Sequence, residues 1–300
     1  MQRASYLLAY PFLWFISILP FPLFYAFSDL VFFLVYRVVG YRKKVVWNNL
    51  QLAFPEKGDG ELRDIRRNFY RHMCDTFLES IKTMHIGADS LRARYQLPNI
   101  GLLRELERHR SILVLFSHYG NWEWSIVVNT FVTSRGYAVY QKLNNPYFDR
   151  LIKRIRARWQ TTPINQKETV RTVVRNEKEG IRGVYGIVSD QSPQVHLAQY
   201  WAPFMGITVP IFTGAESLAR KLDLAVVFAK VTRVSRGHYS LEFVPICERG
   251  KHTSEHQITD AFLRLTEAQI REEPTYYLWT HRRWKHRDKA PRPPVDTRGA

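Results

Sequence analysis

From residue 111 onward, short apolar segments alternate with amphipathic segments of helical length, and this alternation constrains the fold most. The predicted strands are Ile112–Phe116, Tyr137–Gln141, Val184–Val188, Leu224–Val231 and Tyr239–Pro245. The predicted helices between and after them are Trp124–Phe131, Tyr147–Trp159, Lys167–Lys178, Ala215–Lys221 and Thr259–Arg271. Strands that alternate with helices are typical of an α/β domain, in which helices flank a mixed sheet.

The N-terminal region differs from the rest because Tyr6–Val39 is the most apolar part of the chain. Pro20 and Pro22 interrupt it, so neither apolar run reaches the roughly 20 residues of a simple membrane span. Together the two runs predict one kinked span or a re-entrant pair. A signal peptide fits less well, because the stretch is too long and no small-residue cleavage site follows. The basic cluster that follows, up to Lys44, predicts that the remaining chain lies on the cytoplasmic side.

The predicted organisation has three parts. Residues 1–40 form a membrane anchor, residues 41–289 form the α/β domain, and residues 290–300 form a disordered basic tail. The α/β domain opens with a helical segment, since apolar residues in Asp59–Met84 recur at three- and four-residue steps.

The chain carries a net charge of +17, which favours anionic partners such as nucleic acid, an anionic bilayer or an acidic protein. No helix-turn-helix, zinc-finger or RNA-recognition signature is present, which argues against nucleic acid. The two cysteines, Cys74 and Cys247, lack metal-ligand spacing and are predicted to be reduced thiols. No HExxH motif or cysteine cluster supports a metal site.

The segment Ser117–Glu123 is the strongest candidate for chemistry. It directly follows the buried strand Ile112–Phe116, and functional groups gather at the carboxyl ends of strands in α/β sheets. His118 there could act as a general base near neutral pH. Asn121 could cap the next helix. Glu123 would lie in the first helical turn, where we expect it to orient His118 and stabilise its charged form.

Several blocks give this chain a resemblance to a known family. The His118-x4-Glu123 spacing resembles the signature of the lipid A late acyltransferases, within the lysophospholipid acyltransferase-like superfamily. Other blocks similar to that family follow the same order: Tyr41–Leu50 with Ala53-Phe54-Pro55, Asn145–Asp149, Arg156, Ser189–Pro193, Phe204-Met205-Gly206 and Tyr277–Lys285. Each block is weak alone, and their ordered combination over residues 8–287 is specific. Two departures, Trp159-Gln160 after Arg158 and Met205 for a usual phenylalanine, affect no catalytic group.

This resemblance implies an enzyme with a glycerol-3-phosphate-acyltransferase-like core at the cytoplasmic face of the bacterial inner membrane. Its donor would be an acyl-carrier protein thioester and its acceptor a hydroxyl of a lipid A precursor, a glycolipid. Neither a cofactor nor a metal is implied.

The resemblance also implies roles for individual residues. His118 and Glu123 would be catalytic. Arg156 and Arg158 would contact phosphate or the transition state, and the site carboxylate Asp190 would position Arg156 or the acceptor. Backbone amides at Gly120 and Asn121 are further candidates for binding the oxyanion. The possible contacts to anionic headgroups are His281, Arg282 and Arg283.

Three other readings stay open from the sequence. The same mechanism could act on a lysophospholipid or an amino-acid lipid, since the His-x4-acid motif is shared across the superfamily. A non-catalytic basic scaffold on the membrane surface, or an inactive paralogue, would keep the charge without the chemistry. The third is metal-dependent hydrolysis, which no HExxH motif or cysteine cluster supports.

Overall fold

Seven strands form the main sheet in the computed structural model, which describes residues 2–291. The order is β1-β9-β8-β2-β5-β3-β4, and the strands span, in that order, Tyr95–Gln96, His238–Cys247, Ala225–Ser235, Ile112–Phe116, Gly183–Val188, Arg135–Tyr140 and Thr161–Asn165. Neighbouring strands of this sheet are parallel, except that β8 and β9 are antiparallel. The predicted mixed sheet is therefore confirmed.

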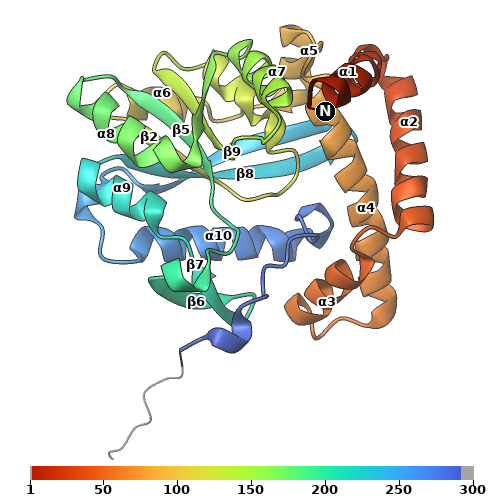
Figure 1. Cartoon of the computed structure of the whole chain (residues 1–300). Coiled ribbons are helices and arrows are strands. Elements are labelled where there is room, and N and C mark those ends of the chain that lie inside the picture. Colours follow the sequence, from red (N-terminus) through yellow and green to blue (C-terminus); the bar gives the residue numbers. More distant parts are fainter. Residues whose placement is uncertain (1, 292–300) are drawn as a thin grey trace, which may run out of the picture.

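Helices cover both faces of the sheet (Figure 1). The α-helices after the N-terminal region are α3 Lys43–Ala53, α4 Asp59–Lys82, α5 Ala88–Arg94, α6 Gly101–Glu107, α7 Pro146–Ala157, α8 Thr169–Lys178, α9 Gly214–Leu222 and α10 Gln257–Glu272. The predicted helix after β2 is a 3-10 helix, η2 Glu123–Thr130. Shorter 3-10 turns are η3 Gln166–Glu168, η4 Val195–Leu197, η5 Gly250–His252, η6 Pro274–Tyr276 and η7 Arg287–Lys289. A separate hairpin pairs β6 Tyr200–Phe204 with β7 Ile207–Ile211.

The central strand β2 is buried on both faces, as expected for a strand between parallel neighbours. Leu113 and Leu115 belong to one core cluster, whereas Ile112, Val114 and Phe116 belong to another on the opposite face. This two-residue alternation explains why the segment reads as a continuous apolar run. It also fixes the carboxyl end of β2 between two packed layers.

The N-terminal region forms two helices, α1 Gln2–Ile18 and α2 Phe21–Phe33, and α2 continues into the π-helical turn η1 Leu34–Val39. The helix is interrupted at Pro20, as predicted. Pro20 lacks the N–H that would continue the α1 hydrogen bonds, and its ψ of 146° lies outside the helical region. Within the described residues, only Phe21–Val39 is long and apolar enough to cross a membrane.

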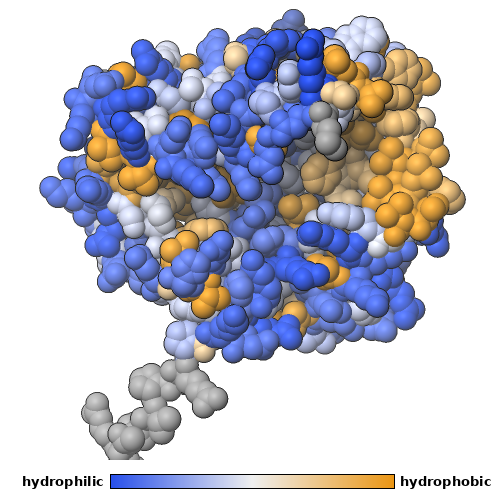
Figure 2. Space-filling view, in the orientation of Figure 1, coloured by the Kyte–Doolittle hydropathy of each residue, from blue (hydrophilic) through white to orange (hydrophobic). Residues whose placement is uncertain are grey.

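The inner face of α2 packs against α4, while its outer face exposes apolar side chains (Figure 2). The large exposed ones on α1, α2 and η1 include Leu7, Leu8, Phe12, Phe15, Leu23, Leu30, Phe33, Leu34 and Val38. Exposed apolar patches of this kind mark interaction surfaces. The anchor itself stays a prediction, and the tail predicted from residue 290 lies, beyond residue 291, outside the described residues.

A buried carboxylate joins the N-terminal helices to the sheet. Glu79 of α4 is fully buried, and its carboxylate accepts hydrogen bonds from Tyr25 of α2, Tyr239 of β9 and Asn121 at 2.7 to 2.8 Å. Its backbone carbonyl also accepts from the Trp124 indole at 2.9 Å. One side chain thus ties α2, β9 and the turn after β2 to α4.

Glu79 should make stability depend on pH. Burial raises its pKa from 4.5 to about 7, although the three hydrogen bonds oppose this rise. Because the folded state holds the proton more tightly than the unfolded state, this contribution is fully present below about pH 4.5 and is lost as pH rises to about 7. Glu79→Gln keeps the shape but does not titrate. We expect the difference in thermal unfolding midpoint between wild type and Glu79→Gln to decline across that window. A difference independent of pH would contradict this account.

Candidate active site

The site forms where two neighbouring parallel strands end. Phe116 of β2 lies opposite Val188 of β5 in the ladder, and the Ser189 amide donates to the Phe116 carbonyl at 3.0 Å. His118 and Asp190 each follow two residues after this last pair, so the register brings them level. The two side chains meet although 72 positions separate them in the chain.

The His118–Asp190 contact is a two-point interaction. The ring Nδ1 of His118 lies 2.6 Å from Asp190 Oδ1, and the His118 backbone N–H donates to Asp190 Oδ2 at 3.0 Å. Because a carboxylate only accepts, Nδ1 carries the proton and Nε2 keeps its lone pair. Gln191 Nε2 lies 3.3 Å from that nitrogen and can donate to it. The ring is therefore held as the tautomer that a general base requires.

Charge and burial act against each other at this pair. Burial disfavours the charged form of His118, but the carboxylates of Asp190 and Glu123 outweigh it and raise the pKa of His118 above its ordinary value. Burial likewise disfavours the Asp190 carboxylate, but His118 and Arg283 hold the pKa of Asp190 below its ordinary value. Asp190 is thus a buried anion that stabilises an imidazolium beside it.

Glu123 contacts Arg156 rather than His118. Glu123 Oε2 lies 3.6 Å from Arg156 Nη2, and the Arg156 guanidinium stands 5.4 Å from the centre of the Tyr140 ring. Arg156 Nη1 is buried and has no hydrogen-bond partner among the described residues. The expected partners are therefore exchanged: Asp190, not Glu123, hydrogen-bonds His118, and Glu123, not Asp190, forms an ion pair with Arg156. The register between β2 and β5 is the reason.

These side chains line a cavity of about 570 Å³. His118, Glu123, Arg156 and Gln191 supply polar groups at its wall. Most other lining residues are apolar and come from β2, β3, β5, η2, α7, α8 and α9, including Phe116, Ile126, Val139, Ile152, Ile187 and Leu218. Further polar side chains in the lining are Ser125, Gln141, Gln166, Thr169 and Ser189. The volume lies within the range of small-molecule sites, and walls that are more apolar than polar suit a largely hydrocarbon ligand.

Gly120 and Asn121 support the turn rather than face the cavity. The Gly120 N–H donates to the Tyr276 carbonyl at 3.0 Å, so it is not free to bind an oxyanion. The Asn121 side chain is fully buried, accepts from the Trp124 N–H at 2.9 Å and donates to Glu79. The predicted capping role of Asn121 agrees with this geometry. The Gly120 amide is not free for the predicted oxyanion contact, whereas the contact predicted for the Asn121 backbone amide stays a prediction.

Arg158 was expected to contact substrate, and this expectation is wrong. Its guanidinium donates to the backbone carbonyls of Thr83, Met84 and Ile86, just after the end of α4. Carbonyls at a helix C-terminus lack partners within the helix, and a cation there also interacts favourably with the helix dipole. Arg158 therefore fastens α7 to α4 outside the cavity.

The terminal block is largely structural as well. Arg283 is buried, donates to Ser192 Oγ at 2.9 Å and to the Pro210 carbonyl at 3.2 Å, and is not available to a headgroup. Burial lowers the pKa of His281 to about 4, so it is neutral near pH 7 and lacks the charge expected of a phosphate ligand. Arg282 is exposed, and its headgroup contact stays a prediction.

The sequence reasoning missed three contributions to the site. Gln191 was quoted inside a motif block but given no role. The Trp122 ring lies 5.1 Å from the His118 ring in an edge-on arrangement. The terminal segment bonds to the turn that carries His118. The Leu278 N–H donates to the His118 carbonyl at 3.0 Å, and Tyr119 and Tyr277 form an isolated antiparallel β-bridge. For Gln191 the sequence did offer a signal, which was its position directly after Asp190. The other two contributions had none.

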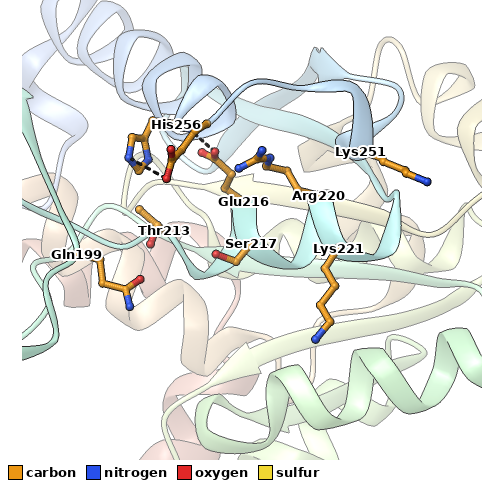
Figure 3. Close-up of a pocket in the computed structure, with 9 residues that line it drawn as sticks. Gln199, Thr213, Glu216, Ser217, Arg220, Lys221, Lys251 and His256 are labelled. Atoms are coloured by element: carbon orange, nitrogen blue, oxygen red, sulfur yellow. Dashed lines mark hydrogen bonds and ion pairs between the residues drawn. The ribbon is translucent and has the colours of Figure 1, made fainter.

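A second pocket, of about 420 Å³, lies on another side of α9 (Figure 3). None of the predicted site residues lines it. Its central carboxylate, Glu216, points to the start of α10, where it accepts from the N–H groups of His256 and Thr259. These contacts satisfy the start of a helix. The cavity beside His118, with its paired titratable groups, is therefore the better candidate for an active site.

Comparison with known proteins identifies the family of the chain. A family model described as bacterial lipid A biosynthesis acyltransferase matches residues 2–286, a range that contains every candidate site residue. The lipid A biosynthesis lauroyltransferase of Escherichia coli (strain K12) is 25% identical over 281 residues, covering 92% of this chain and 89% of that protein. The lipid A biosynthesis palmitoleoyltransferase of the same strain is 23% identical, covering 82% and 79%.

Among solved structures, the 1-acyl-sn-glycerophosphate acyltransferase PlsC from Thermotoga maritima covers 91% of this chain and 97% of its own. The two chains are 12% identical, with a TM-score of 0.40. At that score they superpose only loosely, and neither the fold nor the site is inferred from it.

The His118–Asp190 geometry predicts how the ring titrates. Asp190→Asn removes the charge that favours the imidazolium but keeps the shape of the side chain. We expect the pKa of His118, measured by NMR titration, to lie above its ordinary value in the wild type and to fall in Asp190→Asn. Glu123→Gln should lower it less, because Glu123 makes no hydrogen bond to the ring. Equal pKa values in wild type and Asp190→Asn would rule out the assigned role of Asp190.

Proposed function

The chain belongs to the family of bacterial lipid A biosynthesis acyltransferases, and we propose that it transfers a fatty acyl chain from an acyl-carrier protein thioester to a hydroxyl of a lipid A precursor. The observation that carries the proposal is the His118–Asp190 pair at the wall of an apolar cavity of about 570 Å³. A base with a fixed tautomer beside space for a hydrocarbon chain is what acyl transfer to a lipid requires.

The proposed chemistry starts at His118 Nε2. A hydroxyl is a poor nucleophile, so Nε2 accepts its proton as the oxygen attacks the thioester carbonyl. The resulting tetrahedral intermediate collapses, the carbon–sulfur bond breaks, and the leaving thiolate takes the proton back from the imidazolium. Asp190 stabilises the charged ring between these two steps. The proton balance closes with no cofactor.

Arg156 is the proposed stabiliser of the oxyanion. Its side chain is 14% exposed, and its Nη1 is buried without a partner among the described residues. A cation fixed in a partly dry site favours developing negative charge strongly. Glu123, 3.6 Å away, would hold the guanidinium in place, which gives the second residue of the His-x4-Glu motif a positioning role.

A covalent acyl-enzyme is not part of the proposal. A thiol must ionise to attack a thioester. Burial raises the pKa of Cys74 to about 12 and that of Cys247 to about 11. Neither cysteine lines the cavity. The acyl chain would therefore pass directly from donor to acceptor.

We also propose that the enzyme works at the cytoplasmic face of the bacterial inner membrane. The exposed apolar faces of α1 and α2 would enter the bilayer, and the basic residues that follow would stay on the cytoplasmic side. The net charge of +17 would attract both the anionic leaflet and an acidic carrier protein.

The direct test is acyl transfer from labelled acyl-carrier protein to an under-acylated lipid A precursor in detergent micelles. We expect a product with one more chain from the wild type and a loss of about 10²- to 10⁴-fold in kcat/KM for His118→Ala. The matched control is His109→Ala, since His109 is an exposed histidine outside the cavity. It should retain full activity.

The other outcomes decide between the remaining readings. Product formed only on a lysophospholipid or an amino-acid lipid would keep the mechanism and reject the acceptor. Transfer from acyl-coenzyme A but not from the carrier protein would reject the donor. A folded wild type that acylates no lipid would favour a non-catalytic scaffold.

Gly186 of β5 provides a test of the acyl site. A Cβ built there would lie 3.5 Å from Phe116 Cε2 and 3.6 Å from the Tyr137 carbonyl oxygen, which are ordinary contacts. Gly186→Ala and Gly186→Val should therefore fold and fill the cavity progressively. We expect a graded shift to shorter acyl chains, with the long-to-short ratio of kcat/KM changing roughly tenfold or more for valine. An unchanged chain preference in folded Gly186→Val would exclude this wall from the acyl site.

A further inference from the structure

A groove of about 380 Å³ lies between α3 and the terminal segment, away from the catalytic cavity. It is lined by Lys44, Val45, Asn48, Asn49, Leu52, Arg282, Trp284, Lys285 and Arg287. These residues come from two parts of the chain more than 200 positions apart, so the fold alone brings them together. None of them takes part in the proposed acyl transfer.

Four cations line this groove, which we call the α3 groove: Lys44, Arg282, Lys285 and Arg287. No Asp or Glu is among the described residues that line it. Arg287 contacts Asp288 at 3.5 Å, whereas the other three form no ion pair within residues 2–291. Burial lowers the pKa of the neighbouring His286, and the charges of Lys285 and Lys289 lower it further. The groove therefore presents a concentrated positive charge, and among the described residues only the charge of Arg287 is paired.

Between the cations the groove is apolar. Val45, Leu52 and Trp284 line it, and the Asn48 and Asn49 amides supply neutral polar groups. Free inorganic anions need no such apolar surface. The combination suits a ligand that carries a phosphate next to hydrocarbon, which is the chemistry of a phospholipid at the level of its headgroup.

The position of the groove agrees with this chemistry. The candidate span ends at Val39, and α3 begins at Lys43, so few residues separate them. In Figure 1 the chain passes from the lower end of α2 through a short connection, which includes η1, into α3. Figure 2 shows a mostly hydrophilic surface there, next to the apolar side of α2. Cations that close to a span lie at headgroup depth and attract anionic lipids.

We propose that the α3 groove binds the headgroup of an anionic phospholipid of the bilayer that holds the enzyme. The proposal rests on the membrane location given under the proposed function. An acidic carrier protein would also meet positive charge here, but a phospholipid uses the apolar lining and the depth of the groove as well.

A lipid in this groove would also support the catalytic turn. Asn49 lines the groove, and its amide donates to the carbonyls of Trp279 and His281, each at 2.8 Å. Arg42 donates to the Thr280 carbonyl at 3.1 Å. The same terminal segment bonds to His118 through Leu278. Bound lipid would hold α3 and this segment together, so we expect it to stabilise the fold and to raise kcat.

The test uses full-length protein in neutral detergent, with phosphatidylglycerol or phosphatidylcholine added. We expect phosphatidylglycerol alone to raise the thermal unfolding midpoint and to remain bound in native mass spectrometry. The variant Lys44→Gln/Arg282→Gln/Lys285→Gln/Arg287→Gln should bind it roughly tenfold more weakly or worse. The matched control replaces four exposed cations around α8, as Lys167→Gln/Arg171→Gln/Arg175→Gln/Lys178→Gln, and should bind like the wild type.

Three outcomes would overturn the proposal. An equal effect of inorganic phosphate would mean an ion site without a lipid. An effect of a phosphorylated glycolipid but not of phosphatidylglycerol would assign the groove to the acceptor. Loss of carrier-protein binding with unchanged lipid binding would assign it to the donor. The single variants Arg282→Gln and Lys285→Gln give the same comparison where the fourfold variant does not fold. Binding is measured without turnover, so an inactive wild type that binds phosphatidylglycerol refutes only the proposed function.

Discussion

The hydrogen bond between His118 and Asp190 is the interaction on which the rest of the site depends. It exists because β2 and β5 are parallel neighbours in a register that ends both strands at the same level. A shift of one residue in that register would turn Asp190 to the other side and leave His118 with neither a fixed tautomer nor a counter-ion. The tautomer of His118 and its raised pKa both follow from this pairing.

The turn that carries His118 is held from two sides. Asn121 donates to the buried Glu79, and the Gly120 N–H and the His118 carbonyl bond to the segment around Tyr276 and Leu278. Gly120 has a φ of +58°, and a Cβ there would lie 2.7 Å from Val231 Cγ1, so both the conformation and the space require glycine. Gly120 and Asn121, which lie between the two members of the His-x4-Glu motif, therefore have a structural role. Their place inside the motif is what made them candidates for substrate binding in the sequence.

The sequence predicts local features of this protein well and non-local partners poorly. The bounds of β2 follow from its continuous apolar run, and the importance of His118 follows from its position at the carboxyl end of that strand. The choice between Glu123 and Asp190 as the partner of His118 depends on which strands are neighbours and in what register, and one sequence carries no signal for either. Proximity in the chain favoured Glu123, and the sheet favours Asp190. Strand β4, α6 and the β6–β7 hairpin were missed for a related reason, since their packing outweighs weak local patterns.

The roles of the arginines show the same limit of sequence-based prediction, because positive charge alone does not tell a ligand contact from a structural one. A net charge of +17 suggests many ligand contacts, yet a guanidinium with five donors is equally suited to satisfying several carbonyls inside the protein. Arg158 does so at the end of α4, and Arg283 does so behind Asp190, where its charge also helps to lower the pKa of that carboxyl. Within the described residues, both Arg156 Nη1 and Arg283 Nε are buried without a partner, but only Arg156 lines the cavity. An unsatisfied donor in the cavity, rather than positive charge or motif membership, therefore makes Arg156 the best candidate among these arginines for the proposed contact with a reacting group.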